Sequence, residues 1–215
     1  MAIDGDEARD GLTRRALILA ASCALMPGVA LAALAPTPGA SEGPFYPIRM
    51  PRDDDADLVR VEGAVREAGG EILHLAGRVL DSDARPVAGA RIEIWQCDAN
   101  GVYLHPGDRR LASRDTGFQG FGHATADATG RFAFRTIVPV LYPGRTPHIH
   151  VKVRHGGRDR LITQLYRADH PQNPSDFLFR RLAPEAWRRV SMVIRPRAAS
   201  PRPAFETEFD LVIGV

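Results

Sequence analysis

From residue 72 to the C-terminus, hydrophobic and polar residues alternate in short runs separated by turns rich in Gly, Pro and Asp. Alternation with a period of two is the pattern of a β-strand that buries one face. We expect strands over residues 72–80, 90–96, 131–136, 148–154, 161–166, 189–194 and 206–213. Brief helices are expected only over residues 175–182 and 184–188. The pattern predicts an all-β fold, an antiparallel β-sandwich of about eight short strands with long loops.

Residues 33–71 lack this periodicity. They hold five prolines and the acidic run Asp53–Asp55, with few regularly spaced hydrophobic residues. Proline removes a backbone donor and disfavours both helix and sheet interiors. We therefore expect an extended, proline-rich N-terminal arm over residues 33–71, followed by a β-sandwich domain over residues 72–215.

The first 32 residues have the composition of an export signal. Residues 16–35 are uncharged and follow the pair Arg14 and Arg15, which resembles a twin-arginine signal. Twenty such residues could span a bilayer, but Pro27–Gly28 interrupts them and Ala30–Ala32 offers a small-x-small cleavage pattern. We predict a cleaved signal over residues 1–32, an exported protein that is periplasmic or secreted, and no membrane segment in the mature form. An uncleaved anchor is the alternative.

Composition excludes several classes of protein. With 44% hydrophobic and 25% charged residues, the chain has ordinary globular composition and not that of a disordered one. The formal net charge is +2 and the basic residues form no cluster, so we expect no nucleic-acid partner. Cys23 lies in the predicted signal, with lipid attachment there as a minor alternative. Cys97 is then left without a disulfide partner, and we expect a small buried thiol.

The strand over residues 148–154 carries the sharpest chemical signal. Side chains alternate faces along a strand, so His148 and His150 share one face and Ile149, Val151 and Val153 share the other. Two imidazoles about 7 Å apart along a strand can converge on one metal ion. Taken alone, the tripeptide is better explained by two half-exposed histidines on a polar face.

Two tyrosines near these histidines make a metal site the better explanation. Tyr142 and Arg145 lie in a proline-flanked loop just before the histidines, and Tyr103 follows a turn after an earlier strand. Two phenolates and two neutral imidazoles form a hard donor set suited to ferric iron. The other histidines, His74, His105, His123, His155 and His170, have no such neighbours in the sequence, and only His105 is a candidate for supporting the site.

An ordered series of motifs resembles the intradiol ring-cleavage dioxygenases, and most closely members like protocatechuate 3,4-dioxygenase. The motifs are Glu42–Pro47, Gly77–Asp81, Arg85–Ala90, Ile94–Gln96, Phe118–Gly122, Tyr142–Pro143, Pro147–His150 and Leu161–Tyr166. The resemblance covers about residues 41–182, and the ordered set is far more specific than any single motif.

The resemblance implies a non-haem iron(III) centre held by Tyr103, Tyr142, His148 and His150. It implies that a catechol-type substrate displaces Tyr142, which accepts a substrate proton, and that both atoms of O2 enter between the two hydroxylated carbons to give a muconate-type dicarboxylate. Arg145 matches the family's active-site arginine and stabilises negative charge on the substrate. Gln164 matches a glutamine beside the oxygen pocket.

The sequence leaves the substrate, two alternative functions and the oligomeric state undecided. The short spacing from Tyr142 to His148 lacks an insertion that helps wall the pocket of better-known members, which leaves the identity of the catechol undecided. A non-catalytic β-sandwich binding module is the first alternative, because the pattern over residues 77–90 recurs in binding and adhesion domains. A ferrous oxygenase with two histidines and one carboxylate is the second, but it leaves both tyrosines without a role. The sequence leaves a homo-oligomeric assembly open.

Overall fold

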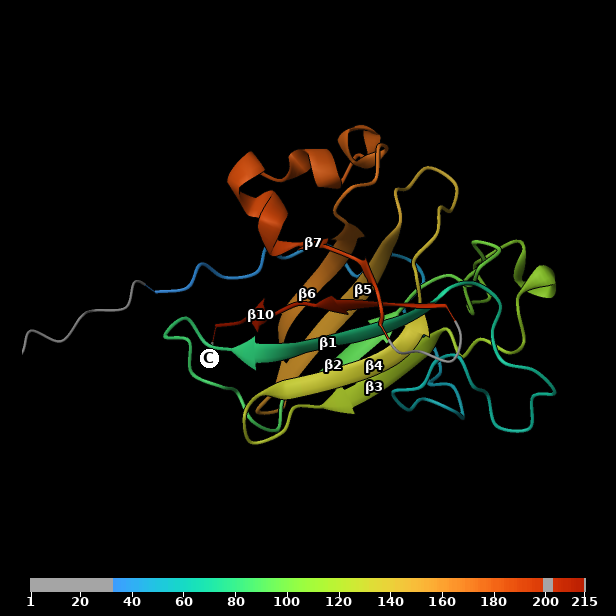
Figure 1. Cartoon of the computed structure of the whole chain (residues 1–215), viewed down its shortest axis with the longest axis horizontal. Coiled ribbons are helices and arrows are strands. Elements are labelled where there is room, and N and C mark those ends of the chain that lie inside the picture. The colour runs from blue at the N-terminus through green and yellow to red at the C-terminus, as the bar shows by residue number, and fades with distance from the viewer. Residues whose placement is uncertain (1–32, 199–202, 215) are drawn as a thin grey trace, which may run out of the picture. The chain divides into compact units, whose positions relative to one another are not determined.

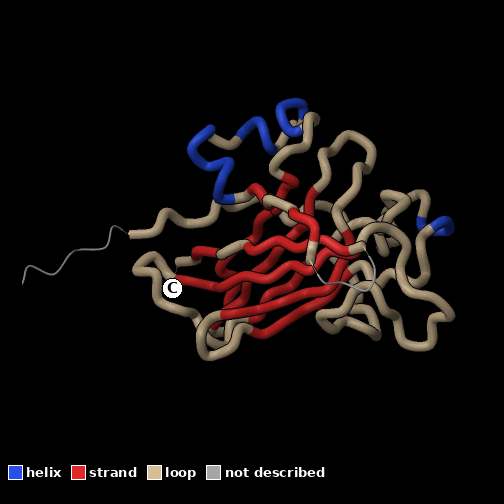
Figure 2. Tube along the Cα trace, in the orientation of Figure 1, coloured by secondary structure: helices blue, strands red, loops and turns tan. Residues whose placement is uncertain are grey.

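The computed structural model describes residues 33–198 and 203–214. The predicted export signal, with Arg14, Arg15 and Cys23, therefore lies outside the described residues. No helix in the described part of the chain has the length and hydrophobicity needed to cross a bilayer. Residues 33–198 and 203–214 form one compact unit, in which the strands gather in the middle and short helices lie in the surrounding loops (Figures 1 and 2).

The first of the two sheets is built around the first strand of the chain. Strand β1 (Ile72–Leu80) pairs with β4 (Arg131–Ile137), β9 (Ala204–Glu208) and β10 (Leu211–Val212), and β9 pairs with β8 (Arg195–Pro196). The β1–β4 pairing is antiparallel and runs from Ile72 opposite Ile137 to Arg78 opposite Arg131.

The second sheet has the strand order β3-β2-β5-β6-β7. Its strands are β2 (Arg91–Trp95), β3 (Phe121–Thr125), β5 (His148–His155), β6 (Arg158–Arg167) and β7 (Ser191–Met192). Four 3-10 helices lie in the connections: η1 (Leu111–Ser113), η2 (Asn173–Ser175), η3 (Phe179–Arg181) and η4 (Pro184–Arg189). Both predicted helical segments therefore occur as short 3-10 turns.

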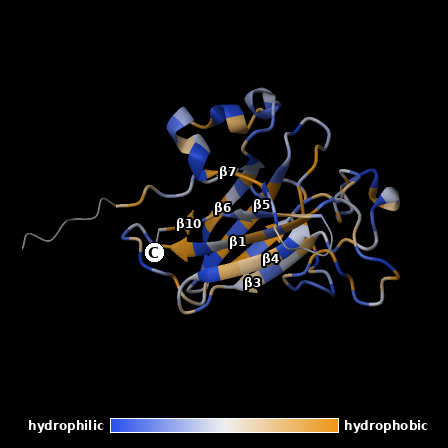
Figure 3. Cartoon of the chain, in the orientation of Figure 1, coloured by the Kyte–Doolittle hydropathy of each residue, from blue (hydrophilic) through white to orange (hydrophobic). Residues whose placement is uncertain are grey.

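The core lies between the facing sides of the two sheets. Ile149, Val151 and Val153 of β5 are at most 1% exposed and belong to the same buried cluster as Leu73 and Leu75 of β1. Figure 3 shows the alternation of hydrophobic and hydrophilic residues along the strands. Since β5 turns its hydrophobic residues to this core, its two histidines lie on the opposite face of the second sheet.

The predicted sandwich is confirmed, but an entirely antiparallel arrangement is wrong. β1 pairs with β9 and β10 in parallel, and β6 pairs with β7 in parallel. The strand expected over residues 206–213 is two strands, because the chain breaks pairing at Phe209–Asp210. There the carboxylate of Asp210 binds the backbone and the guanidinium of Arg78. Of the strand expected over residues 189–194, only β7 pairs, and β3 and β8 were not predicted.

The arm over residues 33–71 contains no strand or helix of its own. It nevertheless contributes to the core, because Leu58 and Val59 are fully buried there. Farther upstream, the backbone N–H of Ala40 donates to the carbonyl of Ile162 on β6. The upstream part of the arm thus covers an edge of β6 that would otherwise expose unpaired backbone groups.

Candidate metal centre and active site

His148 and His150 bring their Nε2 atoms to within 3.2 Å of each other. Both residues are 2% exposed, so they are not half-exposed histidines on a polar face. Two ligands about 2.1 Å from one metal ion and at right angles to each other lie about 3 Å apart. The two imidazoles are therefore spaced as neighbouring ligands of a single ion.

Both imidazoles are held in the neutral form that binds metals. Burial, with the nearby Arg145 guanidinium, lowers the pKa of His148 to about 4. Burial, with His148 beside it, lowers the pKa of His150 well below its ordinary value. The Nδ1–H of His148 donates to the carbonyl of Thr146 at 2.7 Å, which leaves its Nε2 lone pair free. The ring of Trp95 stacks on His150 at 4.8 Å and fixes its plane.

The two predicted tyrosines adjoin the histidine pair. The ring centroid of Tyr103 lies 5.3 Å from that of Tyr142 and 6.1 Å from that of His150, and Tyr142 lies 5.6 Å from His148. Tyr103 is 2% exposed and its hydroxyl oxygen is buried without a hydrogen-bond partner. Burial raises the pKa of both phenols, for Tyr142 despite the opposing charge of Arg145, so each stays protonated in the absence of a bound metal ion.

Loop geometry explains how the tyrosines reach β5. Asp98 accepts the backbone N–H of Val102, and Asp108 accepts that of Tyr103 at 2.9 Å. Gly101 has φ +72°, and a Cβ there would lie 2.7 Å from the carbonyl oxygen of Leu141. Glycine is therefore required where the loop of Tyr103 touches the loop of Tyr142.

Arg145 is held between two side chains beside Tyr142. Its Nε donates to Asp176 Oδ2 at 2.7 Å, and its Nη2 donates to Gln164 Oε1 at 2.6 Å. Its Nη1 lies 3.5 Å from the hydroxyl of Tyr142. Burial acts to lower the pKa of Arg145, but the hydrogen bond and charge of Asp176 outweigh it, and the pKa is raised. The guanidinium stays charged and its direction is fixed. Tyr166 adds a hydrogen bond to Gln164 at 3.1 Å.

A cavity of about 520 Å³ opens beside Tyr142 and Arg145. It is lined by the loop over residues 141–146 and by Gln172, Ser175 and Asp176. Phe177, which is 51% exposed, lies next to it, with the Arg145 guanidinium 5.2 Å from its ring centroid. The six predicted site residues therefore lie close together, and two of them, Tyr142 and Arg145, line this cavity.

Sequence reasoning missed three contributors to the site. Asp176 carries no local motif, and it reaches Arg145 from 31 residues away. Trp95 lies in a motif that carried the family resemblance, but its stacking on His150 was not foreseen. Phe45 of the arm stacks on Tyr103 at 4.5 Å between ring centroids. For Phe45, the signal was an aromatic pair in the motif over residues 42–47.

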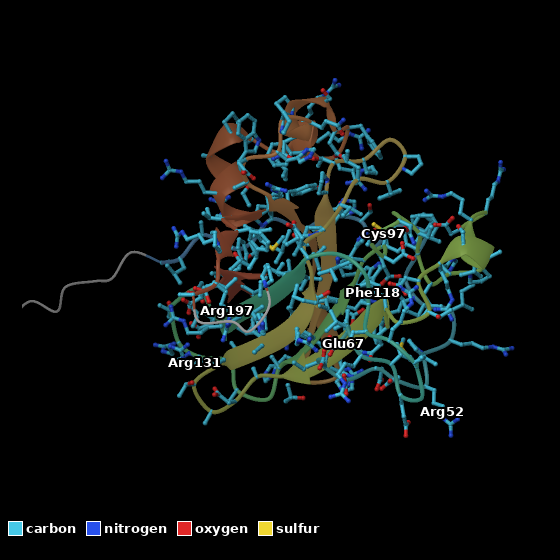
Figure 4. The ribbon with its side chains drawn as sticks, turned by 45° about the vertical axis from the view of Figure 1, so that its right-hand side comes forward. Arg52, Glu67, Cys97, Phe118, Arg131 and Arg197 are labelled. Carbon is cyan, nitrogen blue, oxygen red and sulfur yellow. The ribbon has the colours of Figure 1, made fainter. Side chains whose placement is uncertain are left out.

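Cys97 and the other histidines lie outside the set of candidate ligands. Cys97 is 1% exposed and unpaired, as expected, and Figure 4 shows it inside the molecule with Phe118, while Arg52 points outward. His105 is buried and its ring meets Phe45 edge-on at 5.7 Å, so it supports the neighbourhood of Tyr103. Burial lowers the pKa of His74, which lies on β1, and of His170, whose Nδ1 is 3.2 Å from the hydroxyl oxygen of Thr146.

The donor atoms fit a ferric ion. Within residues 33–198 and 203–214, no three His, Cys, Asp or Glu side chains gather to hold a metal. The four rings described above offer two imidazole nitrogens and two phenol oxygens, a set that ferric iron accepts. The buried hydroxyl of Tyr103 and the buried Nδ1 of His150 lack partners, and an unsatisfied buried hydroxyl costs about 1–3 kcal/mol. A cation between the four rings would satisfy Tyr103 as a phenolate.

Comparisons with known proteins agree with this geometry. A family model described as Dioxygenase matches residues 41–214. The chain is 34% identical over 168 residues to the protocatechuate 3,4-dioxygenase beta chain of Burkholderia cepacia, covering 74% of this chain and 71% of that one. The chain belongs to the intradiol ring-cleavage dioxygenase family. It is also 33% identical over 161 residues to the intradiol ring-cleavage dioxygenase hqdA of Aspergillus niger, covering 66% of this chain and 46% of that protein.

A solved structure supports the same assignment. The dioxygenase domain of a dioxygenase carbohydrate-binding protein fusion from Streptomyces sp. SirexAA-E is 36% identical, with a TM-score of 0.65. The match covers 84% of this chain and 99% of that domain. Membership of this dioxygenase family confirms the family and the reaction class predicted from the sequence. The binding-module alternative is not favoured.

Proposed function

We propose that this intradiol dioxygenase is iron(III)-dependent and opens a catechol-type ring between its two hydroxylated carbons, incorporating both atoms of O2. The observation that carries the proposal is the pair of Nε2 atoms 3.2 Å apart beside the unpartnered hydroxyl of Tyr103. The family supplies the expectation of iron, and the donor set is one that ferric iron prefers.

In this proposal, Tyr103, His148 and His150 are the fixed ligands, because each is at most 2% exposed and packed on neighbouring rings. Tyr142 is the exchangeable ligand, since it lines the open cavity. When bound, ferric iron draws electron density from a chelating catecholate and makes a ring carbon reactive towards O2. Tyr142 would hold the ion in the resting protein, and its Oη would accept a proton from a substrate hydroxyl when the substrate takes its place.

Arg145 stabilises negative charge on the bound substrate. The hydrogen bond and negative charge of Asp176 keep Arg145 charged despite its burial, and its Nη1 is directed to the Tyr142 hydroxyl that the substrate replaces. Gln164 holds the far side of the guanidinium through its Oε1. A donor fixed in advance of the reaction lowers the barrier without a cost for reorganisation.

The carboxylate nearest to Arg145 speaks against the two-histidine, one-carboxylate reading. Asp176 accepts the guanidinium of Arg145 and the backbone N–H groups of Thr146, Leu178 and Phe179. These bonds occupy both of its oxygens. Both tyrosines, in contrast, adjoin the histidines and have a role in the ferric reading.

We propose that the substrate is an aromatic ring with two adjacent hydroxyls. The relatives named above are a protocatechuate dioxygenase and an intradiol ring-cleavage dioxygenase. The loop from Tyr142 to His148 is short, and the cavity beside it is open. We further propose that residues 1–32 direct export and are removed, on the strength of the uncharged stretch and the small-x-small pattern. N-terminal sequencing of the exported protein tests this, with a first residue near Ala33 expected and an intact Met1 contradicting it.

The test of the reaction uses isotopically labelled O2. Iron-loaded protein is mixed with catechol under labelled O2, and the product is analysed by mass spectrometry. The proposal predicts an acyclic muconate-type dicarboxylate that carries both labelled atoms. A product with one labelled atom, cleavage outside the two hydroxylated carbons, or no product from protein with its full iron content would refute it.

A further inference from the structure

Five residues of the arm, Glu42–Tyr46, cross the outer face of the second sheet directly beside the candidate ligands; we refer to them as the strap. The ring of Phe45 lies 4.5 Å from that of Tyr103 at an angle of 19°, a stacked arrangement. Gly43 has φ +77°, and a Cβ there would lie 3.3 Å from Cε1 of His150. The strap therefore touches one tyrosine and one histidine of the site.

The strap is held to the sheet by Lys152 of β5. The Lys152 side chain is 7% exposed and its ammonium forms an ion pair with the carboxylate of Glu42. The same ammonium lies 3.6 Å from the ring centroid of Tyr46, within the range of a cation–π contact. A buried ammonium must be paired to be tolerated, and here both partners come from the strap.

Glu93 of β2 holds the other end of the strap. It is 2% exposed and accepts the hydroxyl of Tyr46 at 2.8 Å, while Arg91 Nε donates to its second oxygen at 2.8 Å. Glu93 lies directly opposite Lys152 in the β2–β5 register. The two strands thus present a buried acid and a buried base side by side, and Tyr46 contacts both.

Lys152 is the only lysine in a chain whose 28 basic residues are otherwise arginine. An ammonium is compact, whereas a guanidinium is broad and planar. At 3.6 Å from the Tyr46 ring, in a position enclosed on nearly every side, the smaller cation suits the space. Lys152 also lies two residues after His150 on the same face of β5, which places the attachment point next to a candidate ligand.

We propose that Lys152 is a positioning residue: it fastens the strap through Glu42 and Tyr46, and so keeps Phe45 against Tyr103 and Gly43 against His150. The effect on the metal centre rests on the proposed function, but the fastening itself does not. Lys152 touches neither substrate nor metal in this account and acts only through the strap.

A chain with one lysine allows the fastening to be measured directly. The full-length, folded protein is treated with formaldehyde and cyanoborohydride, and methylation of Lys152 is followed on the peptide that begins at Thr146. Methylation is expected to be slow in the wild type and about tenfold faster in Glu42→Gln and in Tyr46→Phe. Glu185→Gln, which changes a glutamate far from the strap in sequence, serves as the matched control and is expected to leave the rate unchanged.

Rapid methylation in the wild type, equal to that of the unfolded chain, would overturn the proposal whatever the result with iron. Rates in Glu42→Gln and Tyr46→Phe equal to those of the control would overturn it as well. Both substitutions are mild, and thermal melting verifies that each variant is folded during labelling.

The second readout is the visible band of the iron-loaded protein. If the strap positions Tyr103, Glu42→Gln and Tyr46→Phe shift the tyrosinate-to-iron band while the melting temperature stays near that of the control. An unchanged band together with faster methylation would show a strap that is fastened but does not position the ligand, which overturns the positioning role. Failure of the wild type to take up iron would instead refute the proposed function, and the methylation result would still stand.

Discussion

Arg145 Nε lies 2.7 Å from Asp176 Oδ2, and the pair is almost entirely enclosed, with 7% and 0% of the two side chains exposed. The same carboxylate accepts the backbone N–H of Thr146 at 3.0 Å. One buried acid therefore connects the loop that carries Tyr142 with the segment that follows β6. Asp176 therefore sets the direction of the Arg145 guanidinium, although it lies in none of the sequence motifs that contain the candidate metal ligands.

Replacing Asp176 by Ala is expected to destabilise the protein by about 3–5 kcal/mol, because it leaves the Arg145 charge buried and unpaired. Asp169→Ala is the matched control, since its ion pair with Arg167 is 74% exposed on the Asp side and is expected to contribute at most about 1 kcal/mol. Urea denaturation measures both. Equal losses in the two variants would contradict the role assigned to Asp176.

Arg145→Ala is expected to lower turnover by about 10²–10³, as for other preorganised donors, while iron content stays near that of the wild type. Arg181, which lies 6.0 Å from the Phe177 ring on the exposed side, provides the control substitution Arg181→Ala with a small effect. Turnover is measured with catechol at saturating O2. Near-normal turnover in Arg145→Ala would remove this residue from the active site.

Tyr103→Phe is expected to affect stability and metal binding in opposite ways. In the iron-free protein it removes a buried hydroxyl that has no partner, so stability is unchanged or rises by about 1 kcal/mol. Iron content falls because a ligand is lost. Tyr166→Phe is the control: it breaks the bond to Gln164, costs about 1 kcal/mol and leaves iron bound. Urea denaturation and iron assay together check this, and normal iron in Tyr103→Phe would contradict it.

The iron-free protein is expected to lose stability as pH falls from 6.5 towards 4. Burial lowers the pKa of His148 from 6.5 to about 4, so the unfolded chain binds a proton that the folded one does not. The contribution of neutral His148 to the free energy of unfolding is fully present above pH 6.5. It falls by roughly 3 kcal/mol as the pH decreases to 4. Urea midpoints across this range measure it. His148→Asn should reduce the loss, leaving the part that the buried His150 contributes. A profile unchanged by His148→Asn but flattened by His155→Asn would contradict the assignment.

The sequence predicted those parts of the fold and site that depend on local pattern. The strand over residues 72–80 was predicted with its observed bounds, and alternation on β5 separated His148 and His150 from Ile149 and Val151. These results depend only on a period of two, which a few adjacent residues display. Tyr103 and Tyr142 were singled out by their positions in turns near strands, and the family resemblance implied their role as ligands. The structure places both beside the histidines.

The features that the sequence did not predict depend on contacts between distant parts of the chain. Strand direction is one case, because the pattern of β9 is the same whether it runs with or against β1. The pairing of Arg145 with Asp176 is another, since acid and base are separated by 31 residues and Asp176 lies in no motif. Phe45 is a third, because an aromatic residue in an arm without periodicity does not reveal which ring it will stack on.

The account depends most directly on a ferric centre with tyrosinate ligands and one exchangeable position. The decisive measurement is the visible absorption spectrum of the purified protein, with an iron assay, before and after addition of catechol under nitrogen. The account predicts a reddish protein with one iron per chain and a band that shifts when catechol binds. A colourless protein that holds no iron after reconstitution, or a colourless one that holds ferrous iron, would contradict it.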